Sequence, residues 1–248
     1  MKIILKLLVF FLFFTSNLFA DKISVFEFTT EEFEGLKVRK VRGANAETKY
    51  SLGSNSNGNF LRAEANNAAS GLGKEIKIDL NKTPHLNITW KVERDLKGID
   101  ERSKKGHDYA ARVFVVKKTG ATPLSNRAMN YVFSSNEDID DFHPSPYTKK
   151  SIDFVLSTTK KDLNKWVTVK VNVKEHFKKF HNLDLDEING VAIMADTDNS
   201  KLNSVAYYQN GNVRYIGFYI EGKKHGKWIF KDMDGKEQVF WYENGQKK

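Results

Sequence analysis

The clearest group of potential ligand residues is Asp196, Asp198 and Asn199, which follow an apolar run over residues 191–195. Alternate carboxylates beside an amide can supply part of a Ca²⁺ shell, which takes about six to eight oxygen ligands. The stretch is not an EF-hand loop, because Lys201 stands where that loop requires glycine. Aspartate and asparagine also hold turns by accepting backbone N–H groups. Turn formation, calcium binding and contact with a polar ligand therefore all stay open.

A second pair, Asp108 and Arg112, lies four residues apart on a predicted strand, so both side chains face the same side. Arg112 stands in the apolar run over residues 109–116, and a buried guanidinium must be paired. One interpretation is a structural salt bridge inside the fold. In the other interpretation, the forked guanidinium of Arg112 binds a carboxylate or sugar hydroxyls on a concave sheet.

Asn130 and Tyr131 combine an amide with a flat aromatic ring, as carbohydrate sites do. Tyr131 alternates onto an apolar face, which favours a place in the core. Asn130 is less easily explained, because a buried amide needs hydrogen-bond partners. Trp90 shares the register of the apolar residues in 86–92, so we expect it in the core.

Other kinds of catalytic site find little support. The six histidines show no metal spacing, H-E-x-x-H is absent, and the chain has no cysteine for thiol chemistry or Cys-type zinc sites. Ser70 lacks the flanking glycine of a nucleophile elbow, and residues 71–74 are too short for a phosphate loop. Apart from calcium, we expect no cofactor. A carboxylate pair for glycoside hydrolysis stays open, because Asp and Glu abound.

The elements that must position these residues are strands. Apolar side chains occupy every second position in residues 86–93 and 166–173, which is typical of strands with one buried face. Residues 109–116 and 191–195 are apolar on both faces and predict central strands. One short amphipathic helix is predicted at residues 174–180. The pattern predicts an all-β antiparallel sandwich.

The N-terminus has the layout of a secretory signal peptide over residues 1–20. Lys2 and Lys6 supply charge, residues 7–14 are apolar, and Ala20 is the small residue at the cut. The apolar stretch is too short for a stable membrane span, although an uncleaved anchor stays open. We therefore expect a secreted protein, in the periplasm, with no membrane span after cleavage. Export argues against nucleic acid as a partner, and basic residues alternate with acidic ones as on a solvated surface.

The sequence pattern changes near residue 209. A Tyr-x-x-Gly unit recurs at residues 208–211, 219–222 and 242–245, which predicts strands that close on tight turns. Residues 215–228 resemble a MORN-type repeat, and that resemblance implies a β-hairpin meander used as a spacer or an interaction surface, without catalysis. We therefore divide the chain into a sandwich over residues 21–209 and a repeat tail over residues 210–248.

The sandwich resembles the exported bacterial family of domain-of-unknown-function 3047. The resemblance rests on several blocks in the same order, at residues 61–64, 69–72, 90–92, 108–113, 130–132, 146–147, 193–199 and 207–208. Phe133 stands where family members tend to have Trp, and the tail is not a usual part of the family. The family name assigns no activity, so no catalytic residue follows from it. The layout is similar to jelly-roll, galactose-binding-like modules, which suggests sugar binding by fold analogy only.

These observations favour an exported, non-catalytic binding module that recognises a carbohydrate or another cell-envelope component. Its expected ligand-binding residues are Asp108, Arg112, Asn130, Tyr131, Asp196, Asp198 and Asn199. One alternative is an enzyme that acts on polysaccharide through a carboxylate pair on the concave sheet. The other is a structural envelope protein that contacts a partner protein through its repeat tail.

Overall fold

The computed structural model describes residues 23–36, 38–210, 215–220, 223–231 and 237–248, and within these ranges the chain forms three sheets and three α-helices. The predicted signal peptide lies outside the described residues. None of the described helices is long and apolar enough to cross a membrane.

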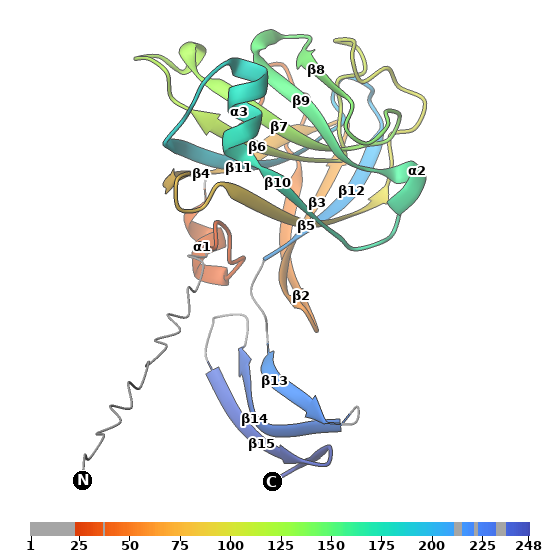
Figure 1. Ribbon diagram of the computed structural model, residues 1–248. Coiled ribbons are helices and arrows are strands. Elements are labelled where there is room, and N and C mark those ends of the chain that lie inside the picture. The colour runs from red at the N-terminus through yellow and green to blue at the C-terminus, as the bar shows by residue number, and fades with distance from the viewer. Residues whose placement is uncertain (1–22, 37, 211–214, 221–222, 232–236) are drawn as a thin grey trace, which may run out of the picture.

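The larger sheet has seven strands and forms one layer of the sandwich (Figure 1). In spatial order they are β1 (Val38–Lys40), β4 (Ala69–Asp79), β11 (Glu187–Asp196), β6 (Ala111–Lys117), β7 (Arg127–Ser134), β9 (Thr148–Thr158) and β8 (Phe142–Ser145). The runs predicted to be central strands are β6 and β11, and each is paired on both sides.

The second layer is a five-stranded sheet. Its strands in spatial order are β10 (Val167–Asn172), β5 (His85–Arg94), β12 (Asn203–Gln209), β3 (Gly58–Asn66) and β2 (Lys49–Asn55). All neighbours in both layers pair antiparallel except β7 and β9, which run parallel. The predicted all-β, jelly-roll-like sandwich is confirmed.

The main core fills the space between these two sheets. Alternation along each strand decides which residues enter it: on β6, Val113 and Val115 point inward, whereas Arg112 points to the outer face. Trp90 is fully buried, as predicted, and its indole N–H donates to the Ser157 hydroxyl at 3.0 Å. This bond satisfies the one polar group that the ring carries into the core.

Helices are short and lie at the margins of the sheets (Figure 1). The predicted helix is α3 (Val173–His181), which begins after Asn172, whose side chain accepts the Glu175 N–H, and ends at Asn182 in the left-handed conformation. Two further helices, α1 (Thr30–Gly35) and α2 (Thr159–Asp162), were not predicted, and a one-turn 3₁₀ helix spans Pro123–Ser125.

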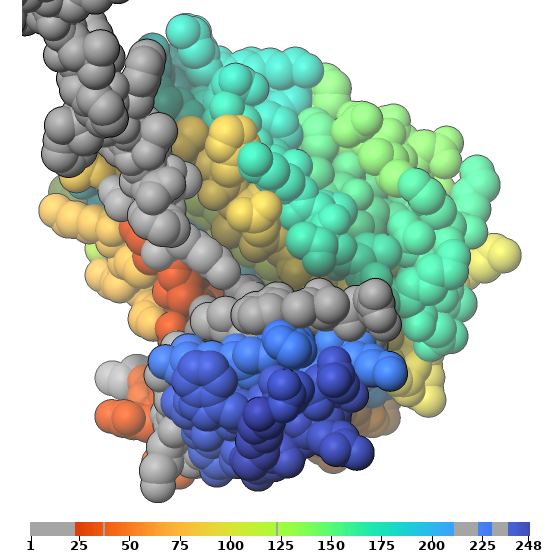
Figure 2. Space-filling view, turned by 60° about the horizontal axis from the view of Figure 1, so that its bottom comes forward, coloured from red at the N-terminus to blue at the C-terminus, as the bar shows by residue number. Residues whose placement is uncertain are grey.

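The C-terminal part of the chain forms a separate four-stranded antiparallel sheet, seen at the bottom of Figure 1 and in dark blue in Figure 2. Its strands are β13 (Tyr215–Ile220), β14 (Lys223–Lys231), β15 (Glu237–Glu243) and β16 (Gln246–Lys247). Consecutive strands are neighbours, which makes the sheet a meander. Its assignment to MORN-type repeats stays a prediction.

Candidate functional site

A buried polar cluster lies on the outer face of the larger sheet. Arg112 on β6, Asn130 on β7 and Asp153 on β9 all point to this face, and each is at most 4 % exposed. The segment over residues 95–110 and the turn over residues 197–200 supply the other members of the cluster. Buried polar groups require partners, so the hydrogen bonds of the cluster define its geometry.

Arg112 and Asp196 form an ion pair at the centre of the cluster. The guanidinium donates to both carboxylate oxygens, at 2.9 and 3.2 Å, and to the carbonyl of His107 at 3.2 Å. The centre of the Tyr109 ring lies 4.5 Å from the guanidinium carbon. The backbone N–H of Tyr109 donates to the Asp196 carboxylate. Burial raises the pKa of Asp196 to about 7, although the Arg112 guanidinium opposes that rise. Arg112 thus has the geometry of a structural salt bridge.

Asp108 holds the turn that follows β11. Its carboxylate accepts the side-chain N–H of Asn199 at 2.8 Å and the backbone N–H of Ser200 at 2.6 Å. Asp108 itself precedes β6, which begins at Ala111, so the prediction that it lies on the same strand as Arg112 is wrong. Both residues nevertheless lie beside Asp196: Arg112 donates to its carboxylate, and a carboxylate oxygen of Asp108 lies within 4.8 Å of one of its oxygens.

Asp108, Asp196 and Asp198 each place a carboxylate oxygen within 4.8 Å of the other two. The oxygens of Asp108 and Asp196 already accept hydrogen bonds from protein N–H groups, and Arg112 supplies a positive charge beside them. Burial raises the pKa of the partly exposed Asp198, and Asp108 adds to this rise. Turn formation therefore explains most of these contacts, and calcium binding stays a prediction.

Asn130 belongs to a second part of the same cluster. Its amide donates to the Asp153 carboxylate and to the Ser151 hydroxyl, both at 2.8 Å. The other oxygen of Asp153 lies 2.8 Å from the Nε2 atom of His107. Burial lowers the pKa of the His107 imidazole. Burial alone would raise the pKa of Asp153, but the bond from His107 and the charge of Arg112 outweigh it and lower that pKa. Asn130 therefore positions Asp153.

The cluster continues through His143 on β8 to two glutamates. Nε2 of His143 lies 3.3 Å from Glu137 and 3.3 Å from the Tyr109 hydroxyl. Glu101 accepts from the backbone of Ser135 at 2.8 Å and from the side chains of Ser134 and Asn136. Sequence patterns did not single out His107, His143 or Asp153, because their contacts form only in the folded sheet; His107 and Asp153, for example, are 46 residues apart.

Tyr131 does not join the cluster, and its assignment to a ligand site is a prediction that the structure contradicts. It points to the inner face of β7, opposite to Asn130, and is completely buried. Its ring packs against Phe154 and against His176 of α3, with centroids 6.5 and 5.8 Å away. Successive residues of a strand face opposite sides, so Asn130 and Tyr131 cannot serve one site.

The exposed part of this region centres on Tyr147, which follows β8 and is 56 % exposed. Its hydroxyl donates to the side-chain oxygen of Asn199 at 2.8 Å and lies 3.2 Å from the carbonyl of Lys104. The ring and the His107 imidazole form a T-shaped pair, with 5.6 Å between their centroids. The turn residues that Asp108 holds therefore fix the orientation of a solvent-facing aromatic ring.

We call Lys104, Tyr147, Asp198 and Asn199 the Tyr147 patch. It offers a flat ring, an ammonium group, a partly exposed carboxylate and an amide at the surface. Lys104 holds its ammonium group 5.8 Å from the centre of the ring. The other aspartates of the cluster, Asp108, Asp153 and Asp196, are at most 3 % exposed. The patch can bind a ligand by stacking and hydrogen bonding, and the buried groups serve to position it.

The sandwich matches one family of proteins over residues 34–211, a family described as "Protein of unknown function (DUF3047)". The chain belongs to the DUF3047 family. The DUF3047 match ends before β13, so the C-terminal sheet lies outside it. No curated protein matches the chain.

Among solved structures, the DUF3047 chain is similar to a meso-active, thermo-stable cellulase derived from the Cel12A cellulase of Rhodothermus marinus. The two are 10 % identical, with a TM-score of 0.39, and the match covers 71 % of this chain and 94 % of the other. A likeness this weak carries no functional argument.

Proposed function

We propose that this protein is an exported, non-catalytic module that binds carbohydrate through the Tyr147 patch. The observation that carries the proposal is an exposed tyrosine ring whose orientation is fixed by a hydrogen bond to Asn199 and by contact with the His107 ring. Aromatic faces bind the apolar faces of ligands, and amide and carboxylate groups add direction through hydrogen bonds. A pyranose ring presents such a face together with hydroxyls.

The network beneath the patch supports this proposal through preorganisation. Asp108 and Asn199 are connected to Arg112 and Asp196 by contacts between buried groups, so the surface groups require little ordering when a ligand binds. Lower ordering cost means that more of the contact energy appears as affinity. A carbohydrate of the cell envelope is the partner that the proposed export to the periplasm makes accessible.

A hydrolase acting through a carboxylate pair receives less support. Two catalytic carboxylates must flank a bound sugar about 5 to 9.5 Å apart, with room for the substrate between them. Here the three neighbouring carboxylates lie within 4.8 Å, and both Asp108 and Asp196 are buried and bonded to the protein. A role carried by the C-terminal sheet alone would leave the fixed orientation of the exposed Tyr147 ring without a function.

The proposal is tested with a glycan array that includes neutral and acidic envelope polysaccharides, followed by calorimetry on any glycan that binds. Tyr147→Ala should reduce affinity by about fivefold or more, since stacking on an aromatic ring contributes about 1 kcal/mol or more. Tyr147→Phe keeps the ring and should retain most of the affinity.

Trp241→Ala is the matched control, because Trp241 is similarly exposed, at 58 %, but lies in the C-terminal sheet. Equal loss from Tyr147→Ala and Trp241→Ala contradicts the assignment of binding to the Tyr147 patch. Binding to no glycan on the array contradicts the proposed function itself.

A further inference from the structure

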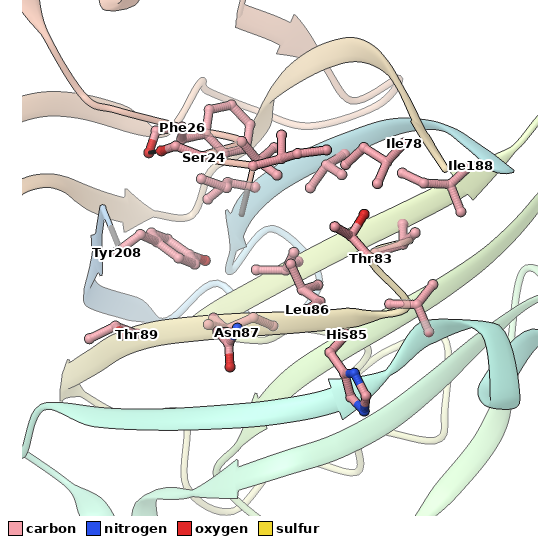
Figure 3. Close-up of a pocket in the computed structure, with 18 of the residues that line it drawn as sticks. Ser24, Phe26, Ile78, Thr83, His85, Leu86, Asn87, Thr89, Ile188 and Tyr208 are labelled. Carbon is pink, nitrogen blue, oxygen red and sulfur yellow. Dashed lines mark hydrogen bonds between the residues drawn. The ribbon is translucent and has the colours of Figure 1, made fainter. Parts of the chain in front are cut away.

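A narrow cavity of about 200 Å³ lies inside the sandwich, between the two larger sheets (Figure 3). We call it the inter-sheet slot. Leu86 and Ile88 of β5 line one side, and Val113, Val115 and Ile193 of β6 and β11 line the other. Protein cores are close-packed and contain few voids larger than a water molecule. A space of this size between two sheets is therefore a candidate binding site.

The slot runs along β5. Its lining follows that strand from His85 to Thr89, a length of about 13 Å at the rise of a β-strand. An extended acyl chain of medium length spans this distance. Aliphatic side chains of the lining, such as Leu86, Ile88 and Val113, offer the hydroxyls of a sugar no hydrogen-bond partner.

The surface that the slot presents is mostly apolar. Figure 3 shows that His85 and Asn87 point away from the slot, although their strand borders it. The ring of Tyr208 reaches the wall, but its hydroxyl is engaged by the Met194 carbonyl. In the described part of the chain, no Asp, Glu, Lys or Arg lines the slot. Apolar cavities of comparable size stay dry and take up hydrocarbon ligands.

The N-terminal segment over residues 23–28 forms one wall. Phe26 and Phe28 are buried and stack on each other, with centroids 5.7 Å apart, whereas Ile23 is 46 % exposed. On the opposite side of the slot, Thr83 is partly exposed and lies just before β5. Ile23 and Thr83 are therefore the lining residues beside which a polar end group can reach water.

We propose that the inter-sheet slot binds one unbranched acyl chain of medium length, with its polar end at the opening beside Ile23 and Thr83. The chain can belong to a free fatty acid or to a lipid, since both present the same hydrocarbon. This site is independent of the Tyr147 patch: Val113 and Val115 line the slot from the inner face of β6, while Arg112 belongs to the outer-face cluster.

The test measures binding of decanoate and of 1-decanoyl-lysophosphatidylcholine to the purified protein by calorimetry and by the shift in Tm. We expect one molecule per chain and a rise in Tm, because a ligand of the folded state stabilises it. Val115→Phe should fill the slot and weaken decanoate binding by about tenfold or more. The matched control is Val38→Phe on the exposed edge strand β1, which should bind as the unaltered protein does.

A second variant, Val25→Trp, narrows the opening at a partly buried position, so the test survives if Val115→Phe does not fold. Binding of both probes assigns the slot to lipid acyl chains, and binding of decanoate alone assigns it to free fatty acids. Absence of binding by both probes overturns the proposal. Undiminished binding in every folded slot variant, or uptake of toluene without decanoate, also overturns it.

Discussion

The hydroxyl of Tyr208 joins the two sheets at Arg112. It accepts the backbone N–H of Arg112 at 2.8 Å and donates to the carbonyl of Met194 at 2.6 Å, at the last register pair of β6 and β11. Pairing resumes beyond it, where the Asp196 N–H donates to the Tyr109 carbonyl. Tyr208 lies on β12 in the opposite layer, so one side chain crosses the core and fixes the backbone beneath the polar cluster.

Removing this hydroxyl should therefore destabilise the protein. Tyr208→Phe leaves the Arg112 N–H and the Met194 carbonyl buried without that partner, at a cost of about 1–3 kcal/mol. Denaturant unfolding measures the effect. Tyr147→Phe removes an exposed hydroxyl and should cost much less; an equal loss in both variants would contradict the special role of Tyr208.

The Arg112–Asp196 pair should behave as a buried ion pair. Arg112→Ala leaves the Asp196 carboxylate without its guanidinium partner, which is expected to lower the free energy of unfolding by about 3–5 kcal/mol. The double variant Arg112→Met with Asp196→Leu removes both charges and should be more stable than Arg112→Ala. A double-mutant cycle from urea denaturation tests this coupling, and simple additivity of the two single changes would refute it.

His143 and Glu137 predict a pH dependence. Burial alone would lower the pKa of His143, but the Glu137 carboxylate outweighs it and raises that pKa above 6.5. Burial would likewise raise the pKa of Glu137, yet His143 and Arg102 hold it below 4.5. A raised histidine pKa contributes stability below 6.5 that is lost as the pH rises through the folded-state value. A lowered glutamate pKa contributes stability above 4.5 that is lost on acidification.

The stabilisation by this pair should therefore be greatest between pH 4.5 and 6.5. Unfolding free energies of the unaltered protein and of His143→Gln, measured across pH, should differ most in that window and converge above it. Glu137→Gln should also differ most in that window but should keep a difference above it, because it breaks the ion pair with Arg102 as well. A difference that does not change with pH would show that the two residues do not stabilise the fold as an ion pair.

Gly106 should be intolerant of a side chain. A Cβ atom there would lie 2.5 Å from the carbonyl oxygen of Asp100 and 2.9 Å from its backbone nitrogen, and backbone cannot move aside cheaply. Gly106→Ala should cost about 1–3 kcal/mol and disturb His107 and Asp108, which follow it. Gly35→Ala meets nothing within 4 Å and is the control in thermal unfolding. Equal Tm values for the two variants would contradict the prediction.

Local patterns in the sequence predicted the fold well. Alternation in residues 86–93 and 166–173 corresponds to β5 and β10, and the doubly apolar runs correspond to β6 and β11. The helices α1 and α2 escaped prediction because they have only six and four residues, too few for a helical period to show. The parallel pairing of β7 and β9 has no local signature, since it depends on the path of the chain between them.

The candidate site was predicted only in part. Asp108, Arg112, Asp196, Asp198 and Asn199 do come together, because the predicted strands bring the ends of β6 and β11 side by side. Which groups pair could not be predicted, since Arg112 and Asp196 are 84 residues apart. For Tyr131, the alternation of residues along the strand placed the side chain on an apolar face, and this already favoured a position in the core over one in a ligand site.

Tyr147 falls in one of the blocks that resemble the family, but no local pattern indicated an exposed ring, because only the fold decides that this ring stays at the surface. Its hydrogen bonds reach Lys104 and Asn199, 43 and 52 residues away along the chain, and Asn199 in turn reaches Asp108 across 91 residues. A chain that ends before β11 lacks Asn199 and with it two of these three links. Ligand recognition at this surface would then begin only once the whole sandwich has closed, so a sugar probe would also report the completion of folding.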